Sequence, residues 1–312
     1  MKIFKNKKLS LFLTSLLVLS LILASYIPSF AQTSKVKNVI LLIGDGMGTE
    51  QVNLGRIYKN NKLYMDEFDY TGIASTYSAD PKNKWVTDSA AAGTALATGV
   101  KTYDGAISVD LNQKPIETIL EKAEKNKKST GIVTTARVTH ATPACFASHN
   151  IHRDNENEIA EDIIEHGVDV ILGGGKANFL DKNNNGKRED GRNLIEEAKG
   201  KGYKYVDTRE NLKKVNDEKI LGLFNNSHIS YTLDRNLTVE PSLSEMTDKA
   251  INILSKNNRG FFLMVEGGRI DHAAHNNDPA TMTNEVLDFD EAVKVAYEFA
   301  KKDKQTLVIV TA

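Results

Sequence analysis

Two acidic residues directly follow strand-like hydrophobic runs, in a setting that suits ionic chemistry. Asp45 comes after residues 39–43 and Glu266 comes after residues 261–265, and glycines flank both acids. Ligands bind at the carboxyl ends of strands in open α/β sheets, and glycine lets other groups approach closely. One such acid could equally cap a helix. Two at matching strand ends favour a shared ionic site.

A carboxylate and an imidazole follow the second of these strands. Asp271 and His275 are four residues apart, so a helix here would place both side chains on one face. A carboxylate and an imidazole directed at one point suit zinc. The spacing alone is common, and its position directly after the strand that ends at Glu266 is what favours a metal site.

The segment 86–95 is the sharpest indication of an anion site. Ser89 begins the run SAAAGTA, whose small side chains predict a closely packed helix. Its hydroxyl and the free amides of the first turn would lie at the positive end of the helix dipole, where anions bind. A plain N-cap is the alternative for Ser89. Close packing beneath a bound anion would explain why the helix behind it is built from small residues.

Strands and helices must alternate to position these residues. Hydrophobic runs of strand length alternate with segments of helical periodicity, which predicts a three-layer α/β/α sandwich around a largely parallel sheet. The predicted strands are residues 39–43, 131–134, 168–172, 261–265 and 307–310. The predicted helices are residues 49–59, 116–127, 156–166 and 284–301. The more polar residues 176–260 are expected to form an insertion or a peripheral region.

Within that polar region, Asp181 opens the run DKNNNG, which resembles the first half of a calcium-binding loop. An EF-hand has a bidentate acid at the twelfth position of its loop, and Arg192 occupies that position here. The pattern favours a solvated turn over a calcium site.

The first 31 residues have the layout of an export signal. Four lysines precede the hydrophobic run 9–24, and residues 29–31 (SFA) have the small-x-small form that signal peptidase cleaves. The alternative is an uncleaved membrane anchor, for which the run is short and interrupted by serine and threonine. We therefore expect a secreted or envelope-associated protein.

The charge and the cysteine count narrow the function further. Without residues 1–31 the formal net charge is −5, which argues against a nucleic-acid-binding protein. Cys145 is the single cysteine, so an internal disulfide is impossible. Its neighbours are hydrophobic or small, which predicts a buried thiol.

Six segments, taken in order, resemble the alkaline phosphatase family. They are residues 44–48 (GDGMG), 86–95 (VTDSAAAGTA), 139–144 (THATPA), 170–175 (VILGGG), 265–268 (VEGG) and 270–275 (IDHAAH). The resemblance extends from about residue 37 to the last residue. It implies hydrolysis of small phosphomonoesters through a phosphorylated serine, and a homodimer for the full-length protein.

The resemblance also implies two zinc ions and one magnesium ion. Asp45 would bridge the second zinc and the magnesium, and Thr142 and Glu266 would complete the magnesium's protein ligands. Asp271 and His275 would bind the first zinc.

The same resemblance assigns the catalytic roles. Ser89 would coordinate the second zinc and attack phosphorus. Arg153, by itself a possible surface charge, would bind the phosphate, because a guanidinium fork fits two phosphate oxygens. His140 and His272 stand where members of the family vary, and they are expected near the magnesium and the phosphate. No role is assigned to the remaining histidines, which are His149, His152, His166 and His228.

In the family, the last predicted strand is followed by an Asp-His pair for the second zinc and later by a histidine for the first. Those residues do not follow strand 307–310 here. We therefore expect residues 32–312 to be a catalytic domain that is incomplete at its C-terminus and inactive by itself.

Two alternatives to a phosphomonoesterase remain. One is another hydrolase of the same superfamily, a phosphodiesterase or a sulfatase. A sulfatase needs a C/S-x-P-x-R context, whereas three alanines follow Ser89, and diesterases commonly have threonine at that position. The other is an inactive phosphate-binding fragment.

Overall fold

The computed structural model describes residues 36–82, 85–235 and 239–312. The predicted export signal, residues 1–31, lies outside the described residues. Residues 36–312 group into one compact unit. Among the described residues, every helix is too short or too polar to span a membrane.

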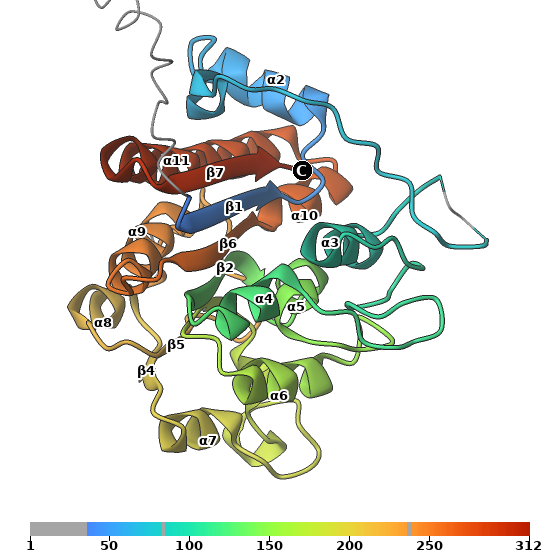
Figure 1. The fold of residues 1–312 in the computed structure, drawn as a ribbon, viewed down its shortest axis with the longest axis vertical. Helices are drawn as coiled ribbons and strands as arrows, with labels where there is room; N and C mark the ends of the chain where they lie inside the picture. Colours follow the sequence, from blue (N-terminus) through green and yellow to red (C-terminus); the bar gives the residue numbers. More distant parts are fainter. Residues whose placement is uncertain (1–35, 83–84, 236–238) are drawn as a thin grey trace, which may run out of the picture. The chain divides into compact units, whose positions relative to one another are not determined.

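One parallel sheet of seven strands organises the described part of the chain, in the order β4-β5-β3-β2-β6-β1-β7 (Figure 1). The strands are β1 (Asn38–Gly44), β2 (Ser129–Arg137), β3 (Val170–Gly174), β4 (Lys204–Val206), β5 (Ile220–Leu223), β6 (Phe261–Gly267) and β7 (Thr306–Thr311). All five strands predicted from the sequence are present, with ends that differ by a few residues.

Helices cover both faces of this sheet and create two hydrophobic cores. Alternate residues of a strand point to opposite faces, so Leu41 and Ile43 of β1 pack in one core while Ile40 and Leu42 pack in the other. The first core includes residues of α3 to α7, and the second includes residues of α8 to α11 with α2 packed against it. The predicted three-layer α/β/α sandwich is confirmed.

The helices match the predicted ones where the sequence has clear periodicity. The α-helices are α2 (Thr49–Tyr58), α3 (Ser89–Thr98), α4 (Ile119–Lys125), α5 (Ala141–Ala147), α6 (Glu156–His166), α7 (Leu194–Gly200), α8 (Arg209–Lys214), α9 (Leu243–Leu254), α10 (Arg269–His275) and α11 (Pro279–Asp303). The short 3-10 helices are η1 (Tyr64–Glu67), η2 (Lys176–Phe179) and η3 (Lys182–Asn184). Capping residues fix the ends: Thr118 and Glu121 form a reciprocal capping box at the start of α4, and Asp278 caps α11.

Residues 176–260, expected to form an insertion or a peripheral region, lie at one edge of the sheet but are part of it. Strands β4 and β5 extend the central sheet, and α9 buries Leu243, Met246 and Ala250 in the second core. The two strands have only three and four residues, so their hydrophobic signal is weak. In the same region the Asp181 carboxylate caps η3 by accepting from the backbone N–H groups of Asn183 and Asn184.

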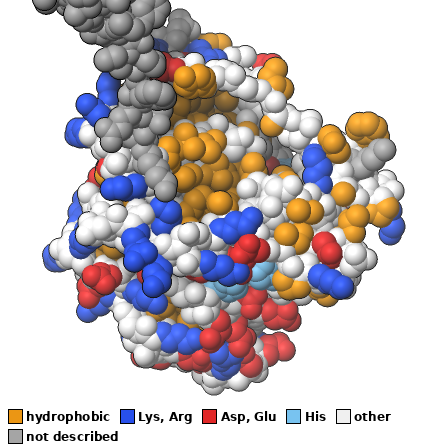
Figure 2. Space-filling view, viewed as in Figure 1, with side chains coloured by type: hydrophobic (Ala, Val, Ile, Leu, Met, Phe, Trp, Pro, Cys, Tyr) orange, Lys and Arg blue, Asp and Glu red, His pale blue; other side chains and the backbone are white. Residues whose placement is uncertain are grey.

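Strand β7 forms the other edge of the sheet and leaves one face open. Its alternate residues Leu307 and Ile309 are 45% and 41% exposed. Figure 2 shows hydrophobic side chains gathered in a hollow over β1 and β7.

Glu124 of α4 generates a prediction about stability. Burial raises the pKa of Glu124 to about 7, and repulsion from Asp169 adds to the effect while the Thr130 hydroxyl opposes it. The pKa of Glu124 is higher in the folded protein than its unfolded value of 4.5. The contribution of the protonated Glu124 to the free energy of unfolding is therefore fully present below pH 4.5. It is lost as the pH rises through about 7.

The free energy of unfolding of the parent protein should fall between about pH 5 and about pH 8. In Glu124→Gln we expect this fall to be smaller by about 1 kcal/mol, a modest figure because solvent partly screens the group. Urea unfolding at several pH values measures the difference. Glu117→Gln, which changes an exposed carboxylate paired with Lys125, is the control and should follow the parent protein. Parallel pH profiles for the parent protein and Glu124→Gln would contradict the prediction.

Candidate metal and anion site

The parallel pairing of β1 and β6 brings two candidate carboxylates together at the carboxyl edge of the sheet. Ile43 lies opposite Glu266 in the register, and Asp45 follows at the end of β1. Helices α3 and α10 lie on the side to which β1 points (Figure 1). Asp45 is buried and Glu266 is completely buried. Their carboxylates and a ring nitrogen of His140 lie within 4.8 Å of one another.

The described side chains offset the negative charge of these carboxylates only in part. Burial and repulsion from Asp45 raise the pKa of Glu266, and burial and repulsion from Asp271 raise the pKa of Asp45. The Oε2 atom of Glu266 accepts a short hydrogen bond from the Thr134 hydroxyl. Its Oε1 atom is buried without a hydrogen-bond partner among the described residues. A buried unpartnered oxygen beside a second carboxylate fits a divalent cation.

Helix α5 lines this carboxylate cluster. Thr142 is 3% exposed, and its side chain is close enough to Glu266 to oppose the rise in the pKa of that carboxyl. His140 is the N-cap residue of α5, and its Nδ1 atom is buried without a partner in the described part of the chain. The sequence placed His140 near the magnesium without making it a ligand. The structure places its ring nitrogen as close to Asp45 and Glu266 as a ligand would be.

The predicted metal pair lies on α10 next to the turn after β1. The Nε2 atom of His275 is 3.5 Å from the Oδ1 atom of Asp271, and the His275 side chain is 80% exposed. Asp271 packs against Gly46, where a Cβ atom would lie 2.6 Å from the Oδ1 atom of Asp271. Gly46 also has a φ of +62°, so the turn requires glycine twice over. Asp271 therefore lies beside Asp45, and His275 is at the exposed rim.

The N-cap of α3 is Asp88, so the hydroxyl of Ser89 is free for other contacts. The Asp88 side chain accepts from the backbone N–H of Ala91 at 2.9 Å. The Ser89 Oγ atom lies 3.1 and 3.2 Å from the two carboxylate oxygens of Asp45, to which it donates. The plain N-cap alternative for Ser89 is therefore wrong.

The small residues of α3 permit a close approach to α5. A Cβ atom added at Gly93 would lie 3.1 Å from the Sγ atom of Cys145, which is completely buried as the sequence predicted. Helix packing at this distance positions Ser89 and Thr142 relative to each other, because the two helices carry one of them each.

Arg153, in the loop after α5, is oriented by two residues of the site. Its Nη1 atom donates to Asp88 Oδ2 at 3.0 Å, and its Nη2 atom lies 3.1 Å from the Nε2 atom of His140. Asp88 thus links the helix that begins at Ser89 to the candidate anion-binding guanidinium. This contact could not be predicted from the sequence, although Asp88 stands next to Ser89.

A cluster of histidines and arginines borders the carboxylates. The ring of His272 lies 4.3 Å from the ring of His228 and 5.4 Å from that of His140. Arg269 bonds to His272 at 3.1 Å, and Arg137 makes a short bond to His228. Burial and these guanidinium groups lower the pKa of His228 and of His272, so both rings are neutral near pH 7. His228 was missed because it comes from the polar region 176–260, far away in the sequence.

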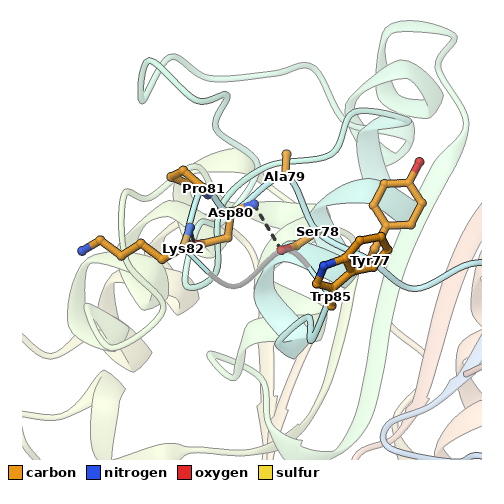
Figure 3. Close-up of a pocket in the computed structure, with 7 residues that line it drawn as sticks. All are labelled: Tyr77, Ser78, Ala79, Asp80, Pro81, Lys82 and Trp85. Atoms are coloured by element: carbon orange, nitrogen blue, oxygen red, sulfur yellow. Dashed lines mark hydrogen bonds between the residues drawn. The ribbon is translucent and has the colours of Figure 1, made fainter.

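A hollow of about 450 Å³ lies elsewhere, in the loop before α3. It is lined by Tyr77, Ser78, Ala79, Asp80, Pro81, Lys82 and Trp85, and Lys82 extends away from the two aromatic rings (Figure 3). The candidate site residues do not line this hollow, so it is not the site described above.

The fold and the clustered side chains define an α/β protein with carboxylates, imidazoles and a guanidinium gathered at the carboxyl edge of a parallel sheet. The family model described as alkaline phosphatase matches residues 36–312. The chain belongs to the alkaline phosphatase family.

Individual relatives agree with the family match. The chain is 48% identical over 292 residues to alkaline phosphatase 4 of Bacillus subtilis (strain 168), covering 89% of this chain and 61% of the relative. It is 40% identical to the repressible alkaline phosphatase of Saccharomyces cerevisiae, covering 95% of this chain and 58% of the relative. The chain thus spans roughly three fifths of these two relatives.

Solved structures are similar as well. The alkaline phosphatase of the Antarctic bacterium TAB5 superposes with a TM-score of 0.81 at 35% identity, covering 89% of this chain and 79% of that one. A variant of that enzyme with Mg bound superposes with a TM-score of 0.80 at 36% identity, covering 90% of this chain and 78% of the variant.

Because the clustered carboxylates repel one another, we expect that removing one of them stabilises the metal-free protein. In metal-free protein at about pH 8, Asp45→Asn should raise the free energy of unfolding by about 1 kcal/mol, because it removes one of the mutually repelling charges. Urea unfolding in the presence of a chelator measures the change. Added magnesium should then stabilise the variant less than the parent protein.

Asp290→Asn is the matched control, because Asp290 is also a buried carboxylate but accepts from Lys59 and from the backbone N–H groups of Tyr64 and Met65. This variant should lose about 2 kcal/mol. An equal loss in Asp45→Asn would mean that Asp45 is a structural carboxylate rather than a cation ligand.

Proposed function

We propose that residues 32–312 form the catalytic domain of a phosphate monoester hydrolase, an alkaline phosphatase with Ser89 as its nucleophile. The observation that carries this proposal is the hydrogen bond from the Ser89 hydroxyl to Asp45. It places a hydroxyl at a helix N-terminus beside buried carboxylates that fit a cation. Membership of the alkaline phosphatase family supports the same function.

We assign the metal ligands from the same cluster. Asp45, Thr142 and Glu266 would hold magnesium, and Asp271 and His275 would hold one zinc. Asp45 and Ser89 would hold a second zinc. Bound divalent ions neutralise the charge of a phosphate dianion and lower the pKa of a hydroxyl.

Ser89 and Arg153 have different roles toward the substrate. The Ser89 Oγ atom forms a bond to phosphorus while the bond from phosphorus to the leaving alcohol oxygen breaks, which gives a phosphoserine and an alcohol. Water then attacks phosphorus, and the departing Ser89 oxygen regains a proton. Arg153 binds two phosphate oxygens through its fork. Its contact with Asp88 orients the guanidinium before the substrate arrives.

We also propose that the protein is exported after cleavage of residues 1–31 and that the full-length enzyme is a homodimer. The lysines and the hydrophobic run of the leader support export. The homodimer follows from the family resemblance alone.

The whole gene product should hydrolyse p-nitrophenyl phosphate with a far higher kcat/KM than bis-p-nitrophenyl phosphate or p-nitrophenyl sulfate. The reason is that the Arg153 fork binds the terminal oxygens of a dianion, which neither a diester nor a sulfate ester supplies. Initial rates at several substrate concentrations measure the three values. A higher kcat/KM for the diester or the sulfate would overturn the monoesterase assignment.

Substitutions of the two assigned catalytic residues should have different effects on the kinetics. Ser89→Ala removes the covalent pathway and should lower kcat by about a thousandfold or more. Arg153→Ala should mainly raise KM and the inhibition constant of inorganic phosphate, with a smaller loss of kcat. Steady-state kinetics and phosphate inhibition separate these effects.

Ser255→Ala and Arg259→Ala are the controls, since both side chains are exposed at or after the end of α9. Both should keep the parent kinetics. A larger kcat loss in Arg153→Ala than in Ser89→Ala would reverse the two assignments.

A further inference from the structure

A second group of metal-ligating side chains lies where α4, α6 and the loop after α5 meet. Glu121, His149 and His166 offer ligand atoms that all lie within 4.8 Å of one another. In the space-filling view, histidine side chains reach the surface near acidic ones in the area between α4 and α6 (Figures 1 and 2). The proposed catalysis uses none of the three residues.

The hydrogen bonds of His149 direct one of its nitrogens at the carboxylate. Its Nδ1 atom lies 2.8 Å from the carbonyl oxygen of Ser108, to which it must donate. In a neutral ring the Nε2 atom then carries a lone pair, and it lies 3.2 Å from the Oε1 atom of Glu121. Two acceptors that face each other at this distance need a cation between them, either a proton or a metal. Orientation of a histidine by a backbone carbonyl is typical of metal ligands.

Glu121 is held in place by its other oxygen. The Oε2 atom accepts from the backbone N–H of Thr118 at 2.7 Å, as part of the α4 capping box. The Oε1 atom therefore projects toward the histidines from a fixed position. The Nδ1 atom of His166, at the end of α6, is 4.0 Å from the same Oε1 atom.

These distances suit a tetrahedral metal centre. Zinc bonds of about 2.0–2.1 Å in tetrahedral geometry place ligand atoms about 3.3 Å apart. The 3.2 Å distance from His149 to Glu121 already matches this spacing. The 4.0 Å distance from His166 would need to shorten by about 0.7 Å, which a rotation of a side chain that is 22% exposed can supply.

The local charge favours a divalent cation. Asp162, whose Oδ2 atom accepts from the Ser148 hydroxyl at 2.6 Å, adds a second carboxylate near His166. Burial lowers the pKa of His166, and repulsion from His149 adds to this while Glu121 and Asp162 oppose it. Glu121 and Asp162 thus place negative charge beside the His166 ring.

We propose that Glu121, His149 and His166 form a separate structural zinc site, completed by water. Two imidazoles and one carboxylate are a zinc-type donor set, whereas magnesium and calcium prefer oxygen alone. The bound ion would tie the start of α4 to the end of α6. It would also hold the first part of the loop that carries Arg153.

The test counts zinc in a background that lacks the proposed active-site ligands. The Asp45→Asn/Asp271→Asn double variant is stripped with a chelator and dialysed against buffered Zn²⁺, and zinc per chain is measured by atomic emission. We expect one zinc per chain to remain. Adding His166→Gln should remove it, whereas adding His152→Gln, an exposed histidine in the loop after α5, should leave it bound. A background without zinc, or a His166→Gln variant that retains it, would overturn the proposal.

A stability measurement separates a metal site from a plain ion pair between Glu121 and His149. His166→Gln leaves that pair intact, so its Tm without metal should equal that of the background. Zn²⁺ should raise the Tm of the background by a few degrees and leave that of His166→Gln unchanged. Equal zinc-induced shifts in both proteins would contradict the site. If the double variant folds poorly, the same two measurements are made in the otherwise unaltered chain. There, His166→Gln should bind one zinc fewer than the parent protein.

Discussion

Repulsion between buried carboxylates is the constraint around which this structure is arranged. Burial and repulsion from Asp271 raise the pKa of Asp45, and burial together with repulsion from Asp45 and Asp271 raises the pKa of Glu266. Only a scaffold that is stable elsewhere can hold them there. The strands that carry Asp45 and Glu266 are buried on both faces by two separate hydrophobic cores, and their register is fixed residue by residue. The hydroxyls of Ser89 and Thr134 donate to these carboxylates without neutralising their charge.

The positive groups nearby offset the charge of the carboxylates only in part. Arg137 is bound by Glu156 through two hydrogen bonds of 2.7 and 2.6 Å. The guanidinium of Arg269 lies 3.7 Å over the ring of Tyr231, and Arg153 is engaged by Asp88. The cationic side chains are thus oriented by their own partners, and the carboxylates retain their demand for a cation. Negative and positive subsites lie side by side without cancelling, which is what a site for both metal ions and an anion requires.

Much of this arrangement could be predicted from local sequence patterns, because strand ends, glycine turns and an i, i+4 pair are local features. Asp45, Glu266 and Asp271 stand directly after or close behind hydrophobic strands, and the run after Ser89 has few interpretations other than a packed helix. Partners that meet only in the folded chain could not be predicted in this way. The hydroxyl of Thr134 reaches Glu266 from the neighbouring strand.

Other residues were missed for the same reason. His228 reaches the site from 44 residues before His272 in the chain. Strands β4 and β5 were missed because they have only three and four residues, and the sheet they join is what stabilises them. The second histidine cluster is similar, since Glu121, His149 and His166 have no common spacing and meet only where their three segments pack.

The packing of α3 on α5 gives the protein a built-in reporter of its own motions. Cys145 is the chain's single cysteine, and its thiol donates to the carbonyl oxygen of Ala90 in the first turn of α3. Burial raises the pKa of that thiol to about 12, and thiol reagents attack only an accessible thiolate. Labelling of Cys145 must therefore wait until the two helices separate. The labelling rate would report how often the helix that carries Ser89 leaves its place, on a timescale that a static structure does not record.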